Sequence, residues 1–230
     1  MIEFLKGSAY FGTVLSLIGF AIGSWANRRL KSPLVNPLLV GAVFVVGMLL
    51  ILRMDYATYQ QTAGYISYFL TPATACLAIP MYRKLDLLKK NLKRVLIGTL
   101  CGTLMSFLTV WLVCRLFRLG HADYVTLLLR SVTTAIGMDL AREAGGNASI
   151  ASAVIICTGI CGNITCTLWI RLFRKKDPVA TGIAIGTASH AIGTAKALEL
   201  GETEGAFSGL AIAVSGIMTS VLFPLFSGLL

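Results

Sequence analysis

Apolar runs separated by short polar segments extend along the whole chain. Four of these runs fall within residues 1–115, the first half, and lie near 11–26, 37–52, 64–82 and 95–114. Two more follow at Ser149–Ile170 and Gly205–Leu230. A helix needs about 20 mostly apolar residues to cross a bilayer, so these runs predict membrane spans. We therefore expect a single transmembrane domain over residues 1–230, with an all-α fold: a polytopic helical bundle in the lipid bilayer.

Two further segments, 122–142 and 178–200, are less clearly spans. Arg130 lies in the middle of the first, and the second is rich in Gly, Ala and Thr. Cytoplasmic loops of membrane proteins are enriched in Lys and Arg. If 122–142 enters and leaves the membrane on one side, 13 basic residues share one face and 5 the other. If it crosses, the division is 10 to 8. The stronger asymmetry favours broken, re-entrant helices.

An internal repeat supports this interpretation. TTAIGMDLAREAG (133–145) aligns with SHAIGTAKALELG (189–201) at an offset of 56 residues. The alternative is chance similarity between Ala- and Gly-rich segments. If each unit is a re-entrant segment followed by one span, the two units are inverted relative to each other, as in many secondary transporters. The sequence thus predicts inverted repeat units at 122–172 and 178–230, with re-entrant tips near 130–137 and 187–194.

Composition excludes several other classes of protein. The chain is 56% apolar and 13% charged, whereas a soluble domain carries about 25% charge. The net charge of +10 lies mostly in three basic segments, so it indicates orientation and contact with anionic lipid rather than nucleic-acid binding. Cys157, Cys161 and Cys166 follow one another without a nearby histidine, which favours packing over metal binding. No metal or cofactor is expected.

Several polar side chains fall at or near the predicted helix breaks. These candidate site residues are Thr71, Arg130, Ser131, Thr133, Thr134, Ser189 and His190. A broken helix exposes unpaired N–H groups and a partial positive charge that suit a carboxylate. Arg130 adds a planar guanidinium for bidentate binding. Alternatively, the Arg130 side chain extends to the membrane–water interface, or it forms a structural ion pair with Asp139 or Glu143.

His190 has two interpretations. Its titration range makes it a candidate proton carrier that would couple anion movement to protons, and a neutral, hydrogen-bonded packing histidine is the alternative. Lys196 and Glu199 are three residues apart and predict a structural ion pair on one helix face. Gly-x3-Gly spacings such as Gly182 and Gly186 allow close helix packing, and one of them can support a homo-oligomer.

Three strings resemble the LrgB/CidB family. They are TPATACLAIPMYRK (71–84), RSVTTAIGMDLAREAGG (130–146) and GTASHAIGTAKALELGETEGAFSGLA (186–211). The resemblance covers nearly the whole chain, and the third string is the most specific. It implies a multi-pass protein of the bacterial cytoplasmic (inner) membrane that acts beside a small holin-like partner of the LrgA/CidA type. Relatives are described as regulators of murein hydrolase export, and others are implicated in moving small monocarboxylates.

Two functions are therefore expected from different classes. The first is a transporter of small monocarboxylates such as pyruvate or glycolate, with Arg130 and the hydroxyls at the breaks binding the anion. The alternative is a non-transporting, antiholin-like regulator of murein hydrolase export and cell lysis. The sequence contains no catalytic triad or phosphate-binding loop, so an enzyme is not expected.

Overall fold

The computed structural model describes residues 8–30, 35–76, 78–172 and 177–230. Helices make up nearly all of this part, and no strand occurs in the ranges described, so the all-α prediction is confirmed. The chain divides into two compact units, Met1–Cys76 and Leu77–Leu230. The site is built in the second unit.

The first unit is a small helical assembly. Its elements are α2 (Phe11–Leu30), α3 (Pro37–Ile51), α4 (Tyr56–Ala63), the 3-10 helix η1 (Gly64–Phe69) and α5 (Leu70–Cys76). Asn36 starts α3, where its side chain accepts a hydrogen bond from Leu38 N at 2.8 Å and Pro37 supplies the preset φ of a first helical residue. A Cβ at Gly19 would lie 3.0 Å from Gly41 O, so α2 and α3 approach closely.

The expected span at 64–82 is divided in the structure. Residues 64–69 form η1, 70–76 form α5, and the next described helix, α6 (Ala78–Arg83), belongs to the second unit. Thr71, which was expected at or near a helix break, lies with Pro72 in the first turn of α5, two residues after η1 ends. Proline is tolerated there because it falls in the first turn of the helix.

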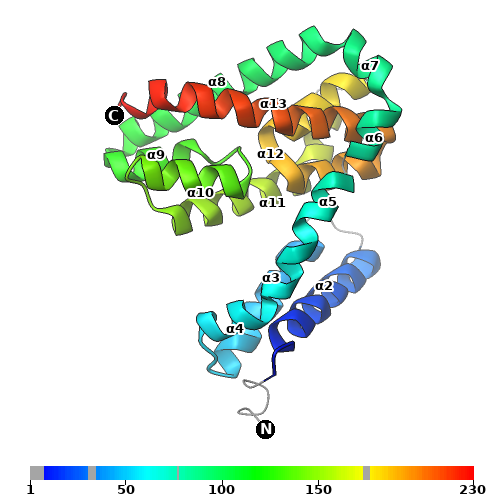
Figure 1. Ribbon diagram of the computed structural model, residues 1–230, viewed down its shortest axis with the longest axis vertical. Coiled ribbons are helices and arrows are strands. Elements are labelled where there is room, and N and C mark those ends of the chain that lie inside the picture. The colour runs from blue at the N-terminus through cyan, green and yellow to red at the C-terminus, as the bar shows by residue number, and fades with distance from the viewer. Residues whose placement is uncertain (1–7, 31–34, 77, 173–176) are drawn as a thin grey trace. The chain divides into compact units, whose positions relative to one another are not determined.

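The second unit contains the long apolar helices. After α6 come α7 (Leu85–Lys90), α8 (Leu92–Phe117), α9 (His121–Leu128), α10 (Thr134–Glu143), α11 (Ala148–Leu172), α12 (Pro178–Leu200) and α13 (Glu202–Ser227). Of the helices described, α8, α11 and α13 are long and apolar enough to cross a membrane, and α3 is a shorter apolar helix. Figure 1 shows α6 and α7 at one end of this unit, with α9 and the C terminus at the other.

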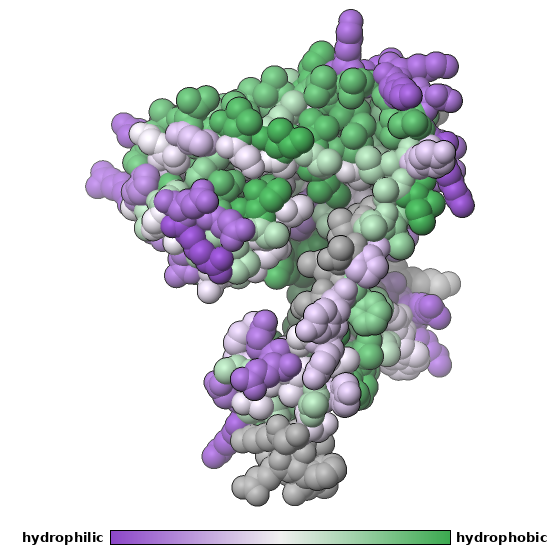
Figure 2. All heavy atoms as spheres, viewed as in Figure 1, coloured by the Kyte–Doolittle hydropathy of each residue, from purple (hydrophilic) through white to green (hydrophobic). Residues whose placement is uncertain are grey.

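Polar residues gather at the two ends of the second unit. Figure 2 shows an apolar surface over α8 and α13 between hydrophilic patches. At one end, Arg83 and Lys84 pair with Glu202 at 3.4 and 3.3 Å. At the other end, His121 Nδ1 is hydrogen-bonded to Leu230 O at 2.7 Å. An apolar belt between polar ends is the surface that a bilayer requires.

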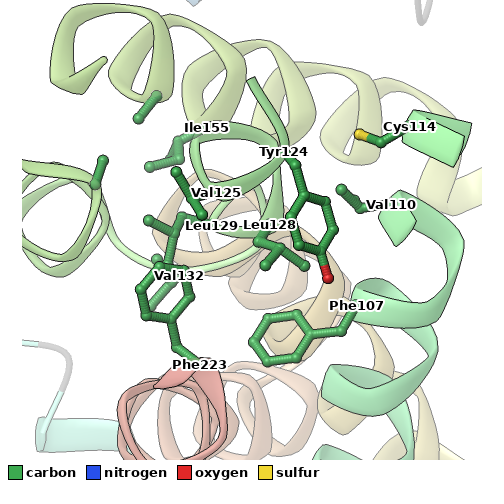
Figure 3. Close-up of a cluster of buried hydrophobic side chains, with 12 residues drawn as sticks. Phe107, Val110, Cys114, Tyr124, Val125, Leu128, Leu129, Val132, Ile155 and Phe223 are labelled. Carbon is green, nitrogen blue, oxygen red and sulfur yellow. The ribbon is translucent and has the colours of Figure 1, made fainter. Parts of the chain in front are cut away.

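A buried apolar cluster holds the end near α9 together. Figure 3 shows side chains of α8, α9, α11 and α13 converging on the segment that follows α9. Tyr124 is fully buried, and its hydroxyl donates to Phe226 O at 2.8 Å. Leu129 and Val132, which lie beyond the end of α9, are 0% and 2% exposed. These two side chains anchor the irregular segment between α9 and α10.

Candidate functional site at two helix breaks

The first break separates α9 from α10. Residues 129–133 are not helical, and Thr133 has an extended backbone with φ −67° and ψ 147°. The chain then reverses, because Asn147 N donates to Thr126 Oγ1 at 2.9 Å. The residues that follow α10 therefore lie beside the last turn of α9. The two helices form a hairpin, with its tip within the segment predicted to break.

The second break falls inside α12, at His190. Its φ of 41° and ψ of −140° interrupt the helix. Residues 185 and 193 would be about 12 Å apart along a straight helix. Instead, a Cβ at Gly193 would lie 3.3 Å from Ile185 O. The chain thus turns back on itself at His190, as predicted for 187–194.

Contacts with α13 confirm that the arms of α12 run in opposite directions. The first arm of α12 precedes His190 and the second follows it. In the first arm, Gly182 lies against Glu204 and Gly186 lies against Ser208, so this arm is parallel to α13. In the second arm, Thr194 Oγ1 is 2.7 Å from Ser208 Oγ, and Leu198 lies against Gly205. This arm is antiparallel to α13. Glycine is required at 182 and 186 because the neighbouring backbone occupies the space of a side chain.

The tips of the two hairpins meet at a small cavity. Its volume is about 10 Å³, and its lining comes from α8, the end of α9, the first break, α12 and α13. Ser131 and Val132 contribute from the first tip, and Thr187 contributes from near the second. Ser131 Oγ is hydrogen-bonded to Ser106 Oγ of α8 at 3.2 Å. The structure therefore brings together two segments that the repeat related only by sequence.

Arg130 faces a different space. It lines a hollow of about 870 Å³ whose other walls are α11 and α12. Its side chain is half-buried, and it makes no hydrogen bond or ion pair with any residue of the described ranges. Asp139, one of its expected alternative partners, instead pairs with Arg142 at 3.2 Å. An unpaired guanidinium in an apolar wall favours binding of an anion.

Of the other predicted residues, Ser189 lines the hollow, whereas Thr133 and Thr134 line neither space. Ser189 is 4% exposed and lines the hollow with Arg130, and Gly162 of α11 provides the room for its side chain. Thr133 caps α10 by position, but its hydroxyl makes no capping hydrogen bond. Thr134 is the first residue of α10. The start of α10 therefore keeps unpaired N–H groups in the segment that carries Arg130.

His190 is held as a structural residue. It is 4% exposed, and Nε2 is 2.9 Å from Ile155 O of α11. A carbonyl oxygen only accepts, so Nε2 carries the proton in this hydrogen bond. Gly159 makes room for the ring, since a Cβ there would lie 2.7 Å from His190 Cε1. These contacts favour the packing interpretation over a proton carrier.

Two expectations concern residues away from this site. Thr71 lies in the first unit, and its side chain is outside what the structure describes. The other six candidate residues lie in the second unit. Lys196 Nζ and Glu199 Oε2 are 2.6 Å apart, which confirms the predicted ion pair. No group of three or more His, Cys, Asp or Glu side chains in the described ranges is placed to hold a metal ion.

Sequence reasoning missed four of the hydroxyls around the small cavity. They are Thr103, Ser106, Thr187 and Thr219. Thr103 and Ser106 recur at helical spacing with the buried Thr99 on α8. That stripe of hydroxyls in an apolar span was the available signal. Thr187 precedes the second tip by three residues, in a segment where many residues are small and weakly polar.

Broken helices, apolar spans and polar ends together define a multi-pass helical membrane protein. Residues 16–229 match the LrgB-like family, and the chain belongs to that family. It is 33% identical over 224 residues to the holin-like protein CidB of Staphylococcus epidermidis, covering 97% of each chain. It is 34% identical over 220 residues to the antiholin-like protein LrgB of Bacillus subtilis, covering 95% of each. No solved structure matches it. The protein is a multi-pass bacterial membrane protein.

Proposed function

We propose that this protein is a non-enzymatic, antiholin-like membrane regulator that controls murein hydrolase release and lysis together with a holin-like partner. The observation that carries this proposal is the match to relatives named holin-like and antiholin-like, each over at least 95% of this chain. The similarity covers nearly the whole length, so it includes the segments that form the long helices and the hairpins of this chain.

The hollow beside Arg130 offers a place for the partner. Four residues at intervals of four along α11 line it, namely Ala153, Cys157, Cys161 and Thr165. On α12, Ala180, Ala184 and Ala188 line it at the same interval. Small side chains at this spacing let a further helix approach closely in a membrane. We propose that a transmembrane helix of the holin-like partner docks here.

A matched pair of substitutions tests the docking surface. Ala184 is exposed and lines the hollow, whereas Ala213 is exposed on α13 and does not line it. We expect Ala184→Phe to fill the hollow and abolish co-purification with the partner. Ala213→Phe adds the same ring at an exposed position on α13 and should leave the complex intact. Equal recovery of the partner with both variants would exclude this surface.

A deletion strain, complemented with variants of the gene, tests the regulatory role. In a strain lacking the gene, we expect altered murein hydrolase activity in the medium and an altered lysis rate, restored by the wild-type gene. Ala184→Phe should fail to restore either property, and Ala213→Phe should restore both. Unchanged hydrolase activity and lysis after deletion would contradict the proposal.

A second candidate function, transport of a small monocarboxylate, is favoured by Arg130. A guanidinium with no partner in the described structure, beside the uncapped start of α10, can bind a carboxylate bidentately. Ser189, which also lines the hollow, can add a hydrogen bond. On this proposal, purified protein moves labelled pyruvate into liposomes and Arg130→Ala abolishes the uptake. His190→Ala would test proton coupling.

A further inference from the structure

The threonines around the small cavity differ from other threonines in the helices. A helical threonine usually satisfies its hydroxyl on the carbonyl four residues earlier. Thr99 donates to Val95 O at 2.7 Å, and Thr194 donates to His190 O at 3.0 Å. Thr187 makes no such bond: its Oγ1 is buried without a hydrogen-bond partner in the described structure. Leaving a buried hydroxyl unsatisfied is unfavourable, so a ligand that pairs with it is favoured.

Four more hydroxyls line the same cavity. Thr103 and Thr219 are 4% and 5% exposed, and neither makes a hydrogen bond within the described ranges. Ser106 and Ser131 contribute the remaining two, hydrogen-bonded to each other. Hydroxyl oxygens have lone pairs to offer a ligand. Five side chains that carry hydroxyl groups, from α8, α13 and both hairpins, therefore line one cavity.

The size and charge of the cavity restrict what can bind. A volume of about 10 Å³ is close to the space of one water-sized particle, so it is too small for a carboxylate-bearing solute. No acidic side chain lines it, whereas multivalent cations usually require carboxylates. A monatomic ion of single charge fits both restrictions.

The backbone favours a cation over an anion. The C-terminal end of α9, at Leu128, lines the cavity, and Thr187 lies in the last turn of the first arm of α12. Helix C-termini carry unpaired carbonyl groups and a partial negative charge. Carbonyls at the ends of half-helices are the groups that coordinate Na⁺ in transporters with discontinuous helices. Arg130 lines the hollow and not this cavity.

We propose that the cavity between the two hairpin tips is a binding site for a monovalent cation of the size of Na⁺, coordinated by Thr187, Ser131 and the neighbouring hydroxyls. The bound cation links the first tip to the second and to α8 and α13. Its occupancy therefore stabilises the contact between the hairpins. The proposal does not depend on whether the protein regulates a partner or moves a solute.

Direct binding of ²²Na⁺ to the purified full-length protein in detergent tests the site. We expect saturable binding to the wild type, and at least about a tenfold loss of affinity in Thr187→Val, because a hydrogen-bonding group that faces a charge contributes about 1.5–3 kcal/mol. Thr99→Val is the matched control. Thr99 is also buried in a span, but its hydroxyl is satisfied by Val95 O, so binding should be unchanged.

Thermal unfolding supplies a second measurement. Replacing choline chloride by NaCl at about ten times the Kd should raise the Tm of the wild type and of Thr99→Val by about 3–5 °C. Thr187→Val should fold normally, because it removes an unsatisfied hydroxyl, but its Na⁺-specific shift should be at most about a third of the wild-type shift, since a tenfold weaker site is only half saturated at this concentration. Absence of saturable ²²Na⁺ binding to the wild type would leave only a water in the cavity and overturn the proposal. Equal binding by Thr187→Val would exclude this location.

Discussion

At the scale of single residues, the site is defined by polar groups that lack a partner or hold an unusual backbone. Arg130 is unpaired within the described structure, while Leu129 and Val132 on either side are buried in the apolar cluster. Its charge was recognisable from the sequence because it interrupts an apolar run. The unsatisfied hydroxyl of Thr187 was not recognisable from the sequence. A threonine in a helix normally donates its hydroxyl to a carbonyl of the same helix, and the sequence does not show when this bond is missing.

Arg130→Met should stabilise the isolated protein. It removes a half-buried charge without breaking a hydrogen bond or ion pair in the described ranges, so we expect the free energy of unfolding to rise by about 1 kcal/mol or more. Arg142→Met is the control, since it breaks an exposed pair with Asp139 and should change stability by about 0.5 kcal/mol or less. Unfolding in detergent measures both. A lower stability of Arg130→Met would show that the guanidinium has a partner.

His190 has a positive φ, which L residues rarely adopt. His190→Ala keeps the strained backbone and loses the hydrogen bond to Ile155 O, so we expect a loss of about 1–3 kcal/mol from the lost hydrogen bond. His190→Gly also loses the bond but relieves the strain, and it should be less destabilised. Thermal unfolding of the two variants checks this order. The reverse order would contradict the assignment of His190 as the residue that turns the chain.

At the scale of elements, the sequence predicted where the helices break but not how the pieces pack. The tips near 130–137 and 187–194 could be located because polar and small residues interrupt apolar runs there. The division of residues 64–82 could not be predicted, because the apolar content of this segment suits one span or several short helices equally well. Close contacts such as Gly159 with His190 join segments distant in sequence, so no local pattern encodes them.

Packing of the second tip on α11 is sensitive to single methyl groups. In Gly159→Ala, the new Cβ would lie 2.7 Å from His190 Cε1 and 2.9 Å from Ile192 Cβ, and we expect a loss of about 1–3 kcal/mol. Gly47→Ala is the control. Gly47 lies inside α3 with no atom within 4 Å of a Cβ, so the change should gain about 0.5–1 kcal/mol. Unfolding midpoints of the two variants should move in opposite directions.

The direction of each hairpin in the membrane is a prediction of the repeat and of the charge distribution. Epitopes inserted in the full-length chain after Gly120 and after Gly145 should both be reached from outside intact protoplasts. An epitope after Gly201 should need permeabilised cells. This pattern follows if 122–142 re-enters and the basic end with Arg83 and Arg94 faces the cytoplasm. Opposite accessibility of Gly120 and Gly145 would instead show a full crossing.

At the scale of the whole molecule, three basic residues of the 83–94 segment are paired with acidic residues. Arg94 lies 3.9 Å from Asp177, and Arg83 and Lys84 pair with Glu202, so these cations gather at one end of the second unit. The sequence predicted this grouping through the loop charges. It could not separate a regulator from a transporter, because both need the same spans, and an unpaired arginine binds a carboxylate of a solute or of a partner equally well.

Flux through the purified protein alone most directly separates these functions. Liposomes that contain the wild-type chain and no holin-like protein are assayed for uptake of labelled pyruvate, beside Arg130→Ala and protein-free liposomes. A regulator that works through its partner predicts that all three show the same background uptake. Uptake by the wild type that Arg130→Ala abolishes would contradict the regulatory account and establish the transporter.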